Sequence, residues 1–429
     1  MSATAEVIAG QAVPQAARDE QAFPYDLWLM GGALTLMCVG LLMVVSTSVS
    51  IAEHRDLPQL YYFFRQLVSG GIGLTAAAVL MRTPLHYFAQ WSTPLLFLAV
   101  IALVAVLIPG LGHEVNGSMR WLGFGFFTLQ TSEQAKLAVV IYVAAYLVRH
   151  NKQVRSEFAG FIKPIGVITL IAGLLLLEPD FGTAVVLFTA VLGMLFLAGV
   201  PNARFFFWGL AALMALAALS MLAPYRLARL MTFMDPWSDP FNTGFQLTQA
   251  LIAFGRGEWF GVGLGNSVQK LFYLPEVHTD FVFAVIAEEA GFVGCLTVIA
   301  LFVFLIWRIF YVGGQAERAG FLFNAYVTYG IGLLIGIQAF VNIGVNMGIL
   351  PTKGLPLPFL SYGSNNLVVT LASIGMALRA GYEASPTVIN RAAASSAPPP
   401  VEAAPAPSHG EPQILGPLPD VDDEDYARV

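Results

Sequence analysis

The stretch FIKPIGVITLIAGLLLLEPDFGTAVVLFTAVLGMLFLAGV, residues 161–200, holds two long apolar runs on either side of the turn Glu178-Pro179-Asp180. A helix needs about 20 largely apolar residues to cross the hydrocarbon core of a bilayer. Each run has about that length, and without the polar turn they would fuse into a segment too long for one crossing. The stretch therefore predicts two consecutive transmembrane helices.

The composition of the whole chain points to the same environment. Of the 429 residues, 57% are hydrophobic and only 11% are charged, whereas a typical soluble domain is about 25% charged. The mean hydropathy is +0.71. Burying so many apolar side chains in water would need an implausibly large core, so the composition excludes an ordinary soluble fold. No basic block indicates a nucleic-acid partner.

Ten apolar runs predict an all-α integral membrane protein with ten transmembrane helices over residues 25–383. The runs lie near 27–50, 61–81, 93–110, 133–149, 161–178, 181–200, 203–223, 280–308, 320–346 and 365–382. The fourth is the weakest because Glu133 and Lys136 open it. Residues 1–24 form an N-terminal tail. Residues 384–429 are rich in Ala, Pro and acidic side chains, which is typical of a disordered tail.

Lysine and arginine in the short loops indicate the orientation, because cytoplasmic loops carry an excess of both. With the N-terminus inside, the inside loops hold Arg82, Arg149, Lys152, Arg155, Lys163, Arg204, Arg308 and Arg318. The short outside loops hold only Arg55, Arg120 and Lys353. This bias predicts that both termini are cytoplasmic and that the large loop 224–279, between the seventh and eighth helices, is extracytoplasmic.

The loop 224–279 is rich in aromatic side chains rather than disordered in composition. Asn242-Thr243 begins a short amphipathic helix through Phe254 in our interpretation. Aromatic rings are favoured at the membrane interface, and long ordered loops are often functional. The glycines of 261–266 offer backbone N–H groups to a pyrophosphate in one interpretation, and in the other they form a tight re-entrant turn.

Polar side chains in and beside the predicted spans gather on one side of the membrane. A charge at bilayer depth costs roughly 3 kcal/mol on insertion scales, so each needs a reason. The set is Glu133, Lys136, Glu178, Asp180, Asp280, Glu288, Glu289, Asn342, Asn346 and Lys353. By the topology above, most of them lie at or near the outer boundary. In one interpretation they are structural, with Glu288 and Glu289 paired to cations and the two asparagines joining helices.

In the other interpretation these groups form a reactive site. Carboxylates with lysine and arginine at a membrane–water boundary suit an amphiphilic anionic substrate. The cations would bind phosphate and a carboxylate would abstract a proton. Cations in the long loop, such as Arg256 and Lys270, would extend the phosphate-binding surface or else face lipid headgroups.

Several motifs together resemble the SEDS family of bacterial cell-wall proteins, most closely its members that act in cell division. They include NGSMRWL at 116–122, SEQAKL at 132–137, EPDFGTA at 178–184, LPEVHTDF at 274–281 and LPTKG at 350–354. Further matches are MDPW at 234–237, NMG at 346–348 and SYG at 361–363. The resemblance extends over roughly residues 25–383, with the motifs in the expected order.

The resemblance implies a ten-helix enzyme that polymerises lipid II into glycan strands on the outer face of the cytoplasmic membrane, at the division septum. The family's catalytic aspartate corresponds to Asp280, as general base. We expect substrate-binding roles for Arg120, Glu133, Lys136, Gln269, Lys270, His278, Glu288, Lys353, Ser361 and Tyr362. A divalent metal, Mg²⁺ or Mn²⁺, is a candidate cofactor without assigned ligands, and no organic cofactor is expected. The implied partners are a class B penicillin-binding protein, the division transpeptidase FtsI, and other membrane proteins of the division machinery.

The chain departs from the family pattern at two positions, and the residues also allow two other functions. Thr131 stands where a proline is usual, and Ser364 replaces a glycine after Ser361-Tyr362-Gly363. Instead of a glycosyltransferase, the chain could be a transporter that moves lipid II through a polar path at Glu288, Glu289 and Lys136. No inverted repeat is visible, and charges on one side argue against alternating access. A non-catalytic scaffold for division proteins is the third hypothesis.

Overall fold

The computed structural model describes residues 25–115, 118–124, 127–222, 232–242, 244–351 and 354–390. All its named helices and strands belong to one compact unit that ends at Ile389. The sequence predictions for the tail 1–24 and for Lys353 lie outside the described residues.

Each of the ten apolar runs is helical. The long helices are α2 (Leu27–His54), α3 (Tyr61–Arg82), α5 (Ser92–Val106), α6 (Thr131–Arg149), α8 (Phe158–Leu177), α9 (Phe181–Leu197), α10 (Asn202–Leu222), α13 (Val282–Arg318), α14 (Leu322–Asn346) and α15 (Ser364–Glu383). Two short helices, α4 (Leu85–Gln90) and α7 (Asn151–Ser156), join longer ones. The chain is also helical over 386–390, within the segment that the sequence analysis assigns to the C-terminal tail.

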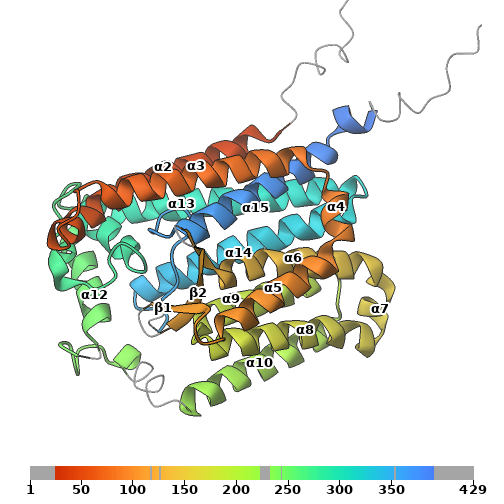
Figure 1. Ribbon diagram of the computed structural model, residues 1–429, viewed down its shortest axis with the longest axis horizontal. Helices are drawn as coiled ribbons and strands as arrows, with labels where there is room; N and C mark the ends of the chain where they lie inside the picture. The colour runs from red at the N-terminus through yellow and green to blue at the C-terminus, as the bar shows by residue number, and fades with distance from the viewer. Residues whose placement is uncertain are drawn as a thin grey trace, which may run out of the picture. The chain divides into compact units, whose positions relative to one another are not determined.

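Five of the helices in the described chain are long and apolar enough to cross a membrane by themselves: α2, α3, α8, α13 and α14. Helices α5 and α9 are apolar but shorter. Figure 1 shows α2, α3, α13 and α15 running side by side, and α3 packs along α15 while α13 packs along α14. The fold is therefore that of a helical membrane protein, and the count of ten crossings stays a prediction.

The turn Glu178-Pro179-Asp180 separates α8 from α9, as the sequence predicts. Asp180 is the N-cap of α9, and its carboxylate accepts a hydrogen bond from the Thr183 N–H at 3.3 Å. An aspartate at this position satisfies one of the N–H groups that a helix start leaves without a partner. The same carboxylate that ends an apolar run thus also begins the next helix.

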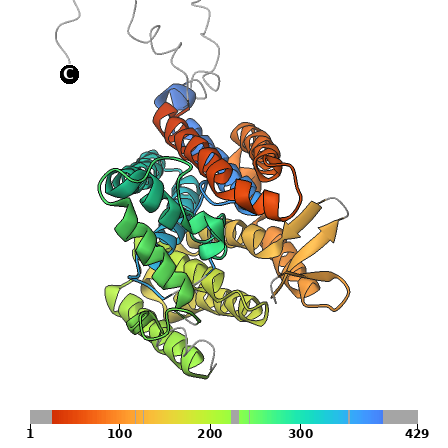
Figure 2. The ribbon, with the colours of Figure 1, turned by 90° about the vertical axis from the view of Figure 1, so that its left-hand side faces the viewer.

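A three-stranded antiparallel sheet was not predicted, and it qualifies the all-α class. Strands β1 (Gly112–Val115), β2 (Ser118–Phe124) and β3 (Phe127–Gln130) pair in the order β1-β2-β3. Figure 2 shows the sheet beside α5, the helix that leads into it. The strand β3 ends at Gln130 and α6 begins at the next residue, Thr131, so the sheet fixes where α6 starts.

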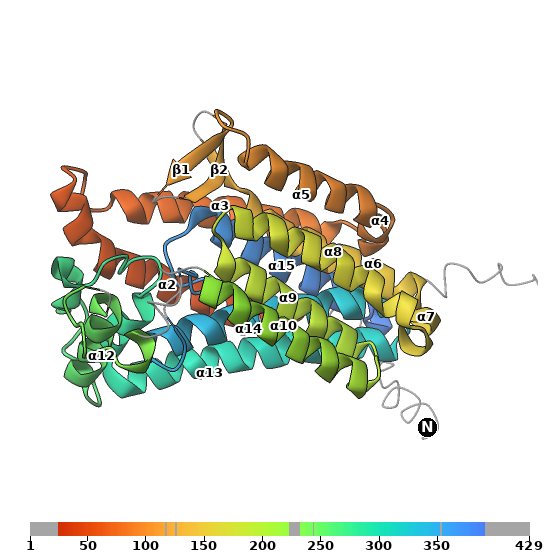
Figure 3. The same cartoon turned by 90° about the horizontal axis from the view of Figure 1, so that it is seen from below.

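The segment predicted as an aromatic loop contains α12 (Phe245–Gly257) and the π-helical turn η1 (Gln269–Tyr273). The predicted amphipathic helix is confirmed, although its N-cap is Gly244 rather than Asn242 or Thr243. Figure 3 shows α12 at the opposite end of the helices from α4 and α7. We call the end that carries α12 and η1 the α12 end.

Helix α13 is broken at Gly291, whose φ of 66° and ψ of −162° are not helical. The segment that follows α12 lies in this break. The N–H groups of Val262 and Gly263 donate to the carbonyls of Glu288 and Glu289, at 2.9 and 3.1 Å. The break is therefore satisfied by protein backbone, which is the condition for irregular backbone at membrane depth. The segment therefore forms a re-entrant turn, and the N–H groups of Val262 and Gly263 bind α13.

Apolar side chains cover the outside of the helices, and polar ones lie within. Exposed examples are Phe97 and Ile101 on α5, Phe206 on α10 and Val303 on α13, each more than 60% exposed. Such a surface in water would be an aggregation site, but it suits contact with lipid.

Gly257 should be sensitive to substitution because α12 approaches α13 there. A Cβ at this position would overlap the carbonyl oxygen of Ala287, whereas a Cβ at Gly255 on the same helix meets nothing within 4 Å. We expect Gly257→Ala to destabilise the protein by about 1–3 kcal/mol through backbone displacement. Gly255→Ala should be neutral or stabilising by up to about 1 kcal/mol. Thermal unfolding of the two variants in detergent checks this, and equal Tm values would contradict it.

Candidate functional site

Asp280 lies in a tight turn directly before α13, whose N-cap is Phe281. Its N–H donates to the Glu276 carbonyl at 3.0 Å. Its own carbonyl accepts from the side-chain amides of Asn342 and Asn346 on α14, at 2.9 and 3.0 Å. A Cβ built on Gly354 would lie 2.9 Å from Oδ2 of Asp280. The carboxylate is thus held next to the chain that follows residues 352–353.

The loop 354–363 is held against α3 by Gln66, a buried residue that the sequence analysis missed. The Gln66 amide nitrogen donates to the Ser361 carbonyl at 3.2 Å, and its oxygen accepts from the Gly363 N–H at 3.3 Å. The Ser361 hydroxyl accepts from the Leu357 N–H at 2.7 Å. A buried glutamine within an apolar run is a signal that could have identified this contact, although not its partner.

His278 and Tyr362 come together near Asp280. The Tyr362 N–H donates to the His278 carbonyl at 2.8 Å, and the two rings lie 5.5 Å apart with Tyr62 beside both. Burial lowers the pKa of His278, with Glu276 opposing and Arg55 reinforcing the shift. Burial also raises the pKa of Tyr362. Both rings are therefore neutral near pH 7, and they can offer hydrogen bonds rather than charge.

Glu133 and Lys136 form a buried ion pair at the start of α6. The Lys136 ammonium lies 2.9 Å from Oε2 of Glu133 and donates to the Gln338 amide oxygen at 2.8 Å. Asn366 on α15 donates to the same Oε2 at 3.1 Å. A small cavity lies beside the pair. These contacts join α6, α14 and α15, so the predicted pair has an internal role whatever it does with substrate.

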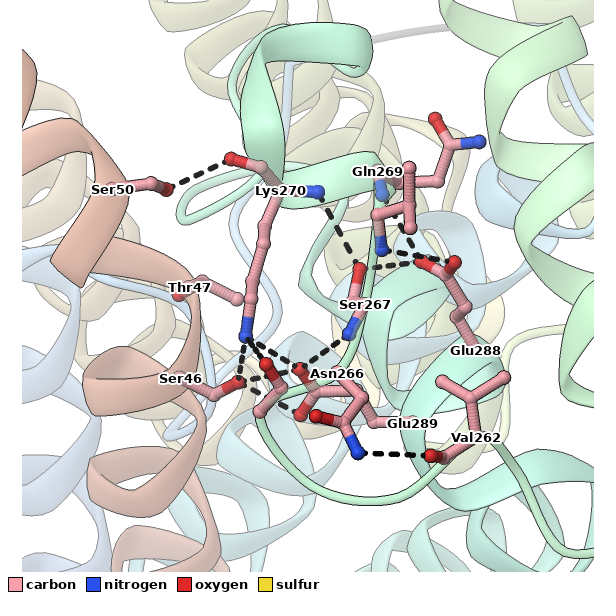
Figure 4. A network of polar contacts seen from close by, with 12 residues as sticks. Ser46, Thr47, Ser50, Val262, Asn266, Ser267, Gln269, Lys270, Glu288 and Glu289 are labelled. Carbon is pink, nitrogen blue, oxygen red and sulfur yellow. Dashed lines mark hydrogen bonds and ion pairs between the residues drawn. The ribbon is translucent and has the colours of Figure 1, made fainter.

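Glu288 and Glu289 on α13 are buried, and Figure 4 shows several hydrogen-bond donors around their carboxylates. Glu288 pairs with Arg256 at 3.1 Å and accepts from the Ser267 hydroxyl and from the N–H groups of Val268 and Gln269. Nearly every donor comes from the chain around η1. Glu288 therefore organises that chain, as the structural interpretation of the sequence expected.

Glu289 ties the same chain to α2. The Lys270 ammonium lies 3.1 Å from Oε1 of Glu289 and also donates to the Gly265 carbonyl. The Ser46 hydroxyl on α2 donates to the Glu289 carboxylate at 2.6 and 2.8 Å, and Ser50 donates to the Lys270 carbonyl at 2.8 Å. Lys270 is thus committed to an internal carboxylate, as Lys136 is.

Arg120 on β2 holds the turn between α8 and α9. Its guanidinium donates to the carbonyls of Glu178 and Pro179 at 3.2 and 2.7 Å and lies 3.9 Å from Oδ1 of Asp180. Both carboxylate oxygens of Glu178 are buried without a hydrogen-bond partner. The contacts of Arg120 fix strand β2 against the turn between α8 and α9.

The predicted site residues therefore fall into separate groups. Asp280, His278, Ser361 and Tyr362 lie around the loop 354–363, and Glu133 with Lys136 reaches the same loop through Gln338, which donates to the Pro356 carbonyl at 2.8 Å. Gln269, Lys270 and Glu288 form the η1 group, and Arg120 stands at the α8–α9 turn. Among the described residues, no group of three or more His, Cys, Asp or Glu side chains could hold a metal ion.

Polar atoms that are buried without a partner also gather at these groups. In the described part of the chain they include Oγ1 of Thr131, Oε1 of Gln134, Oδ2 of Asp180, Oε1 of Gln269 and Nδ1 of His278. Such atoms are costly unless water or a ligand meets them. Most of these atoms lie near the starts of α6, α9 and α13, so each of those places needs a polar partner for its buried atom.

The chain is similar to known cell-wall proteins over most of its length. The model of the FtsW/RodA/SpoVE family, described as cell cycle protein, matches residues 27–385. A probable peptidoglycan glycosyltransferase FtsW of Hahella chejuensis is 51% identical over 88% of this chain and 98% of its own. The corresponding protein of Pseudomonas fluorescens is 53% identical over 83% and 88%.

Solved structures of similar fold support the same relationship. A chain from a peptidoglycan synthase complex that coordinates polymerization and crosslinking has a TM-score of 0.69 and 27% identity, over 85% of this chain and all of its own. The rod shape determining protein RodA of Thermus thermophilus has a TM-score of 0.62 and 27% identity, over 84% of this chain and 97% of its own.

The buried pair Glu133–Lys136 makes a stability prediction. Lys136→Met leaves a buried carboxylate without its cation, which typically costs about 3–5 kcal/mol. We expect the double variant Glu133→Gln/Lys136→Met to be more stable than Lys136→Met alone, because both charges are then absent. Thermal unfolding of the three proteins in detergent checks this. A double variant no more stable than the single one would contradict a predominantly internal ion pair.

Proposed function

Because the chain belongs to the FtsW/RodA/SpoVE family of cell cycle proteins, we propose that it polymerises lipid II with Asp280 as its general base. It is a multi-pass membrane protein and a peptidoglycan glycosyltransferase of the division type, as relatives at about half identity over most of the chain indicate. The single observation that supports the role of Asp280 is its fixed place at the start of α13, beside Gly354.

The proposed reaction forms one bond and breaks one. The 4-hydroxyl of the acceptor sugar attacks the anomeric carbon of the donor, and its proton passes to the Asp280 carboxylate. The bond from the anomeric carbon to the pyrophosphate oxygen breaks, and undecaprenyl pyrophosphate leaves with its electron pair. Inversion in one step converts an α-linked donor into a β-linked strand.

The position of Asp280 suits this role on physical grounds. It stands at the N-terminus of α13, where the helix dipole stabilises a negative charge. Its backbone is held at both N–H and carbonyl, so the side chain is presented from a fixed point. Lys353 immediately precedes Gly354 in the sequence. We propose that its ammonium group stabilises the negative charge of the leaving pyrophosphate.

The remaining predicted residues take supporting roles in the proposal. His278, Ser361 and Tyr362 would meet the sugar or pyrophosphate as neutral hydrogen-bonding groups. Arg120, Glu133, Lys136, Lys270 and Glu288 would act mainly by fixing the elements around the site, since most of their polar atoms are engaged internally. Gln269, whose Oε1 is buried without a hydrogen-bond partner, would offer that oxygen to the substrate. A bound Mg²⁺ or Mn²⁺ would neutralise charge on the pyrophosphate, but we assign it no ligand.

We further propose ten membrane crossings, both termini in the cytoplasm and the α12 end on the outer face of the inner membrane at the septum. A class B penicillin-binding protein, the transpeptidase FtsI, is the proposed partner, together with other division proteins. The similar chain from a complex that couples polymerization to crosslinking supports this partner class.

Asp280→Asn tests the general base. We expect the rate of lipid II polymerisation by the purified protein with its transpeptidase partner to fall by about 10²–10⁴-fold, the usual contribution of general-base catalysis. Glu276→Gln is the matched control, an exposed carboxylate in the same turn, and should stay within threefold of wild type. Glycan strands resolved on a gel give the rate. Undiminished polymerisation by a folded Asp280→Asn protein would exclude the role.

Cysteine labelling tests the orientation. In a background without Cys38 and Cys295, a cysteine at Trp237, which is exposed beyond α10, should react with an impermeant reagent in intact spheroplasts. A cysteine at Lys152 on α7 should react only after lysis. The reverse pattern would overturn the proposed topology.

A further inference from the structure

Helix α14 presents three amide side chains on one face towards the site. Gln338, Asn342 and Asn346 are spaced four residues apart, so they stack on adjacent turns. All three are nearly buried, at 3%, 2% and 0% exposure. Their amide nitrogens donate to main-chain carbonyls of other segments, at Pro356, Leu355 and Asp280. The three amides therefore fix the main chain at Asp280 and at residues 355–356 directly.

Asn342 joins the two chain segments that meet at the Asp280 carboxylate. Its amide nitrogen donates to the Asp280 carbonyl at 2.9 Å and to the Leu355 carbonyl at 2.6 Å. Leu355 is the neighbour of Gly354, whose Cα carries no side chain and lies against the Asp280 carboxylate. One side chain therefore sets the distance between Asp280 and the loop that begins at Gly354.

Asn346 completes the start of α13 from a different helix. The N-cap residue Phe281 has no side-chain acceptor, and the oxygen of Asn346 accepts from the Ala284 N–H at 3.1 Å instead. Its nitrogen donates to the Asp280 carbonyl at 3.0 Å. Asn346 thus supplies the cap that the local sequence lacks and holds Asp280 in the same contact.

We infer that Asn342 and Asn346 are positioning residues for the glycosyl transfer, acting through the backbone of Asp280. The inference rests on the proposed role of Asp280 and goes beyond it. Ordinary interhelical hydrogen bonding would require only that the amides find some acceptor. Here three of their bonds converge on Asp280 and its facing loop, and the acceptor on Asp280 is its main-chain carbonyl.

The experiment measures kcat and KM for lipid II separately, using the full chain with its transpeptidase partner. In Asn342→Ala and Asn346→Ala we expect kcat to fall about 10- to 100-fold, the cost of displacing a catalytic group by about 1 Å. KM should change less than threefold, because neither side chain is expected to contact substrate. Asn342→Leu keeps a branched side chain of similar shape but removes both the amide donor and the oxygen that accepts from Asn346 at 3.3 Å. It should therefore behave like Asn342→Ala even if the alanine variant folds poorly.

Asn324→Ala is the matched control. Asn324 is also a buried asparagine on α14, and its amide donates to Glu383 at the other end of the helix. It should leave kcat and KM within threefold. A folded Asn342→Leu protein with wild-type kcat would overturn the inference, as would equal losses in Asn324→Ala and Asn342→Ala. If Asp280→Asn were fully active, the proposed function itself would fail, whatever the asparagine variants do.

Discussion

The ion pairs of Glu288 and Glu289 hold the chain around η1 in place, and the rest of the α12 end depends on them. A carboxylate removed from water needs several donors at once. Here the donors come from residues 267–270, from Arg256 on α12 and from Ser46 on α2. Because the two buried carboxylates need these donors, they fix the course of the chain that leads to Asp280.

The break in α13 belongs to the same arrangement. Gly291 interrupts the helix immediately after the two glutamates, and the carbonyls that lose their helical partners accept from Val262 and Gly263. The close approach of Gly257 permits this. Side-chain charges and backbone hydrogen bonds thus fix one segment against Glu288 and Glu289 of α13, while Asn346 of α14 binds the first turn of α13 at Ala284.

Sequence patterns predicted local features well and distant partners poorly. The apolar runs identified the ten long helices of the described residues, because hydropathy is a property of consecutive residues. The pair Glu133–Lys136 was predicted because it lies on one face of one helix. Spacing along the chain cannot indicate that Gln66 would bind Ser361, or that Asn342 would bind Leu355 and Asp280. The sheet was missed because its strands are short and lack clear alternation.

The carboxylates of the α12 end differ in what they can still do chemically. Glu288 and Glu289 accept from backbone N–H groups, hydroxyls and a cation, and taking a proton would break those contacts. Glu133 is shared between Lys136 and Asn366. Asp280 is half-buried, and its contacts with α14 use its main-chain carbonyl. A change in the protonation of the Asp280 carboxylate therefore leaves its hydrogen bonds with α14 intact, which suits a general base.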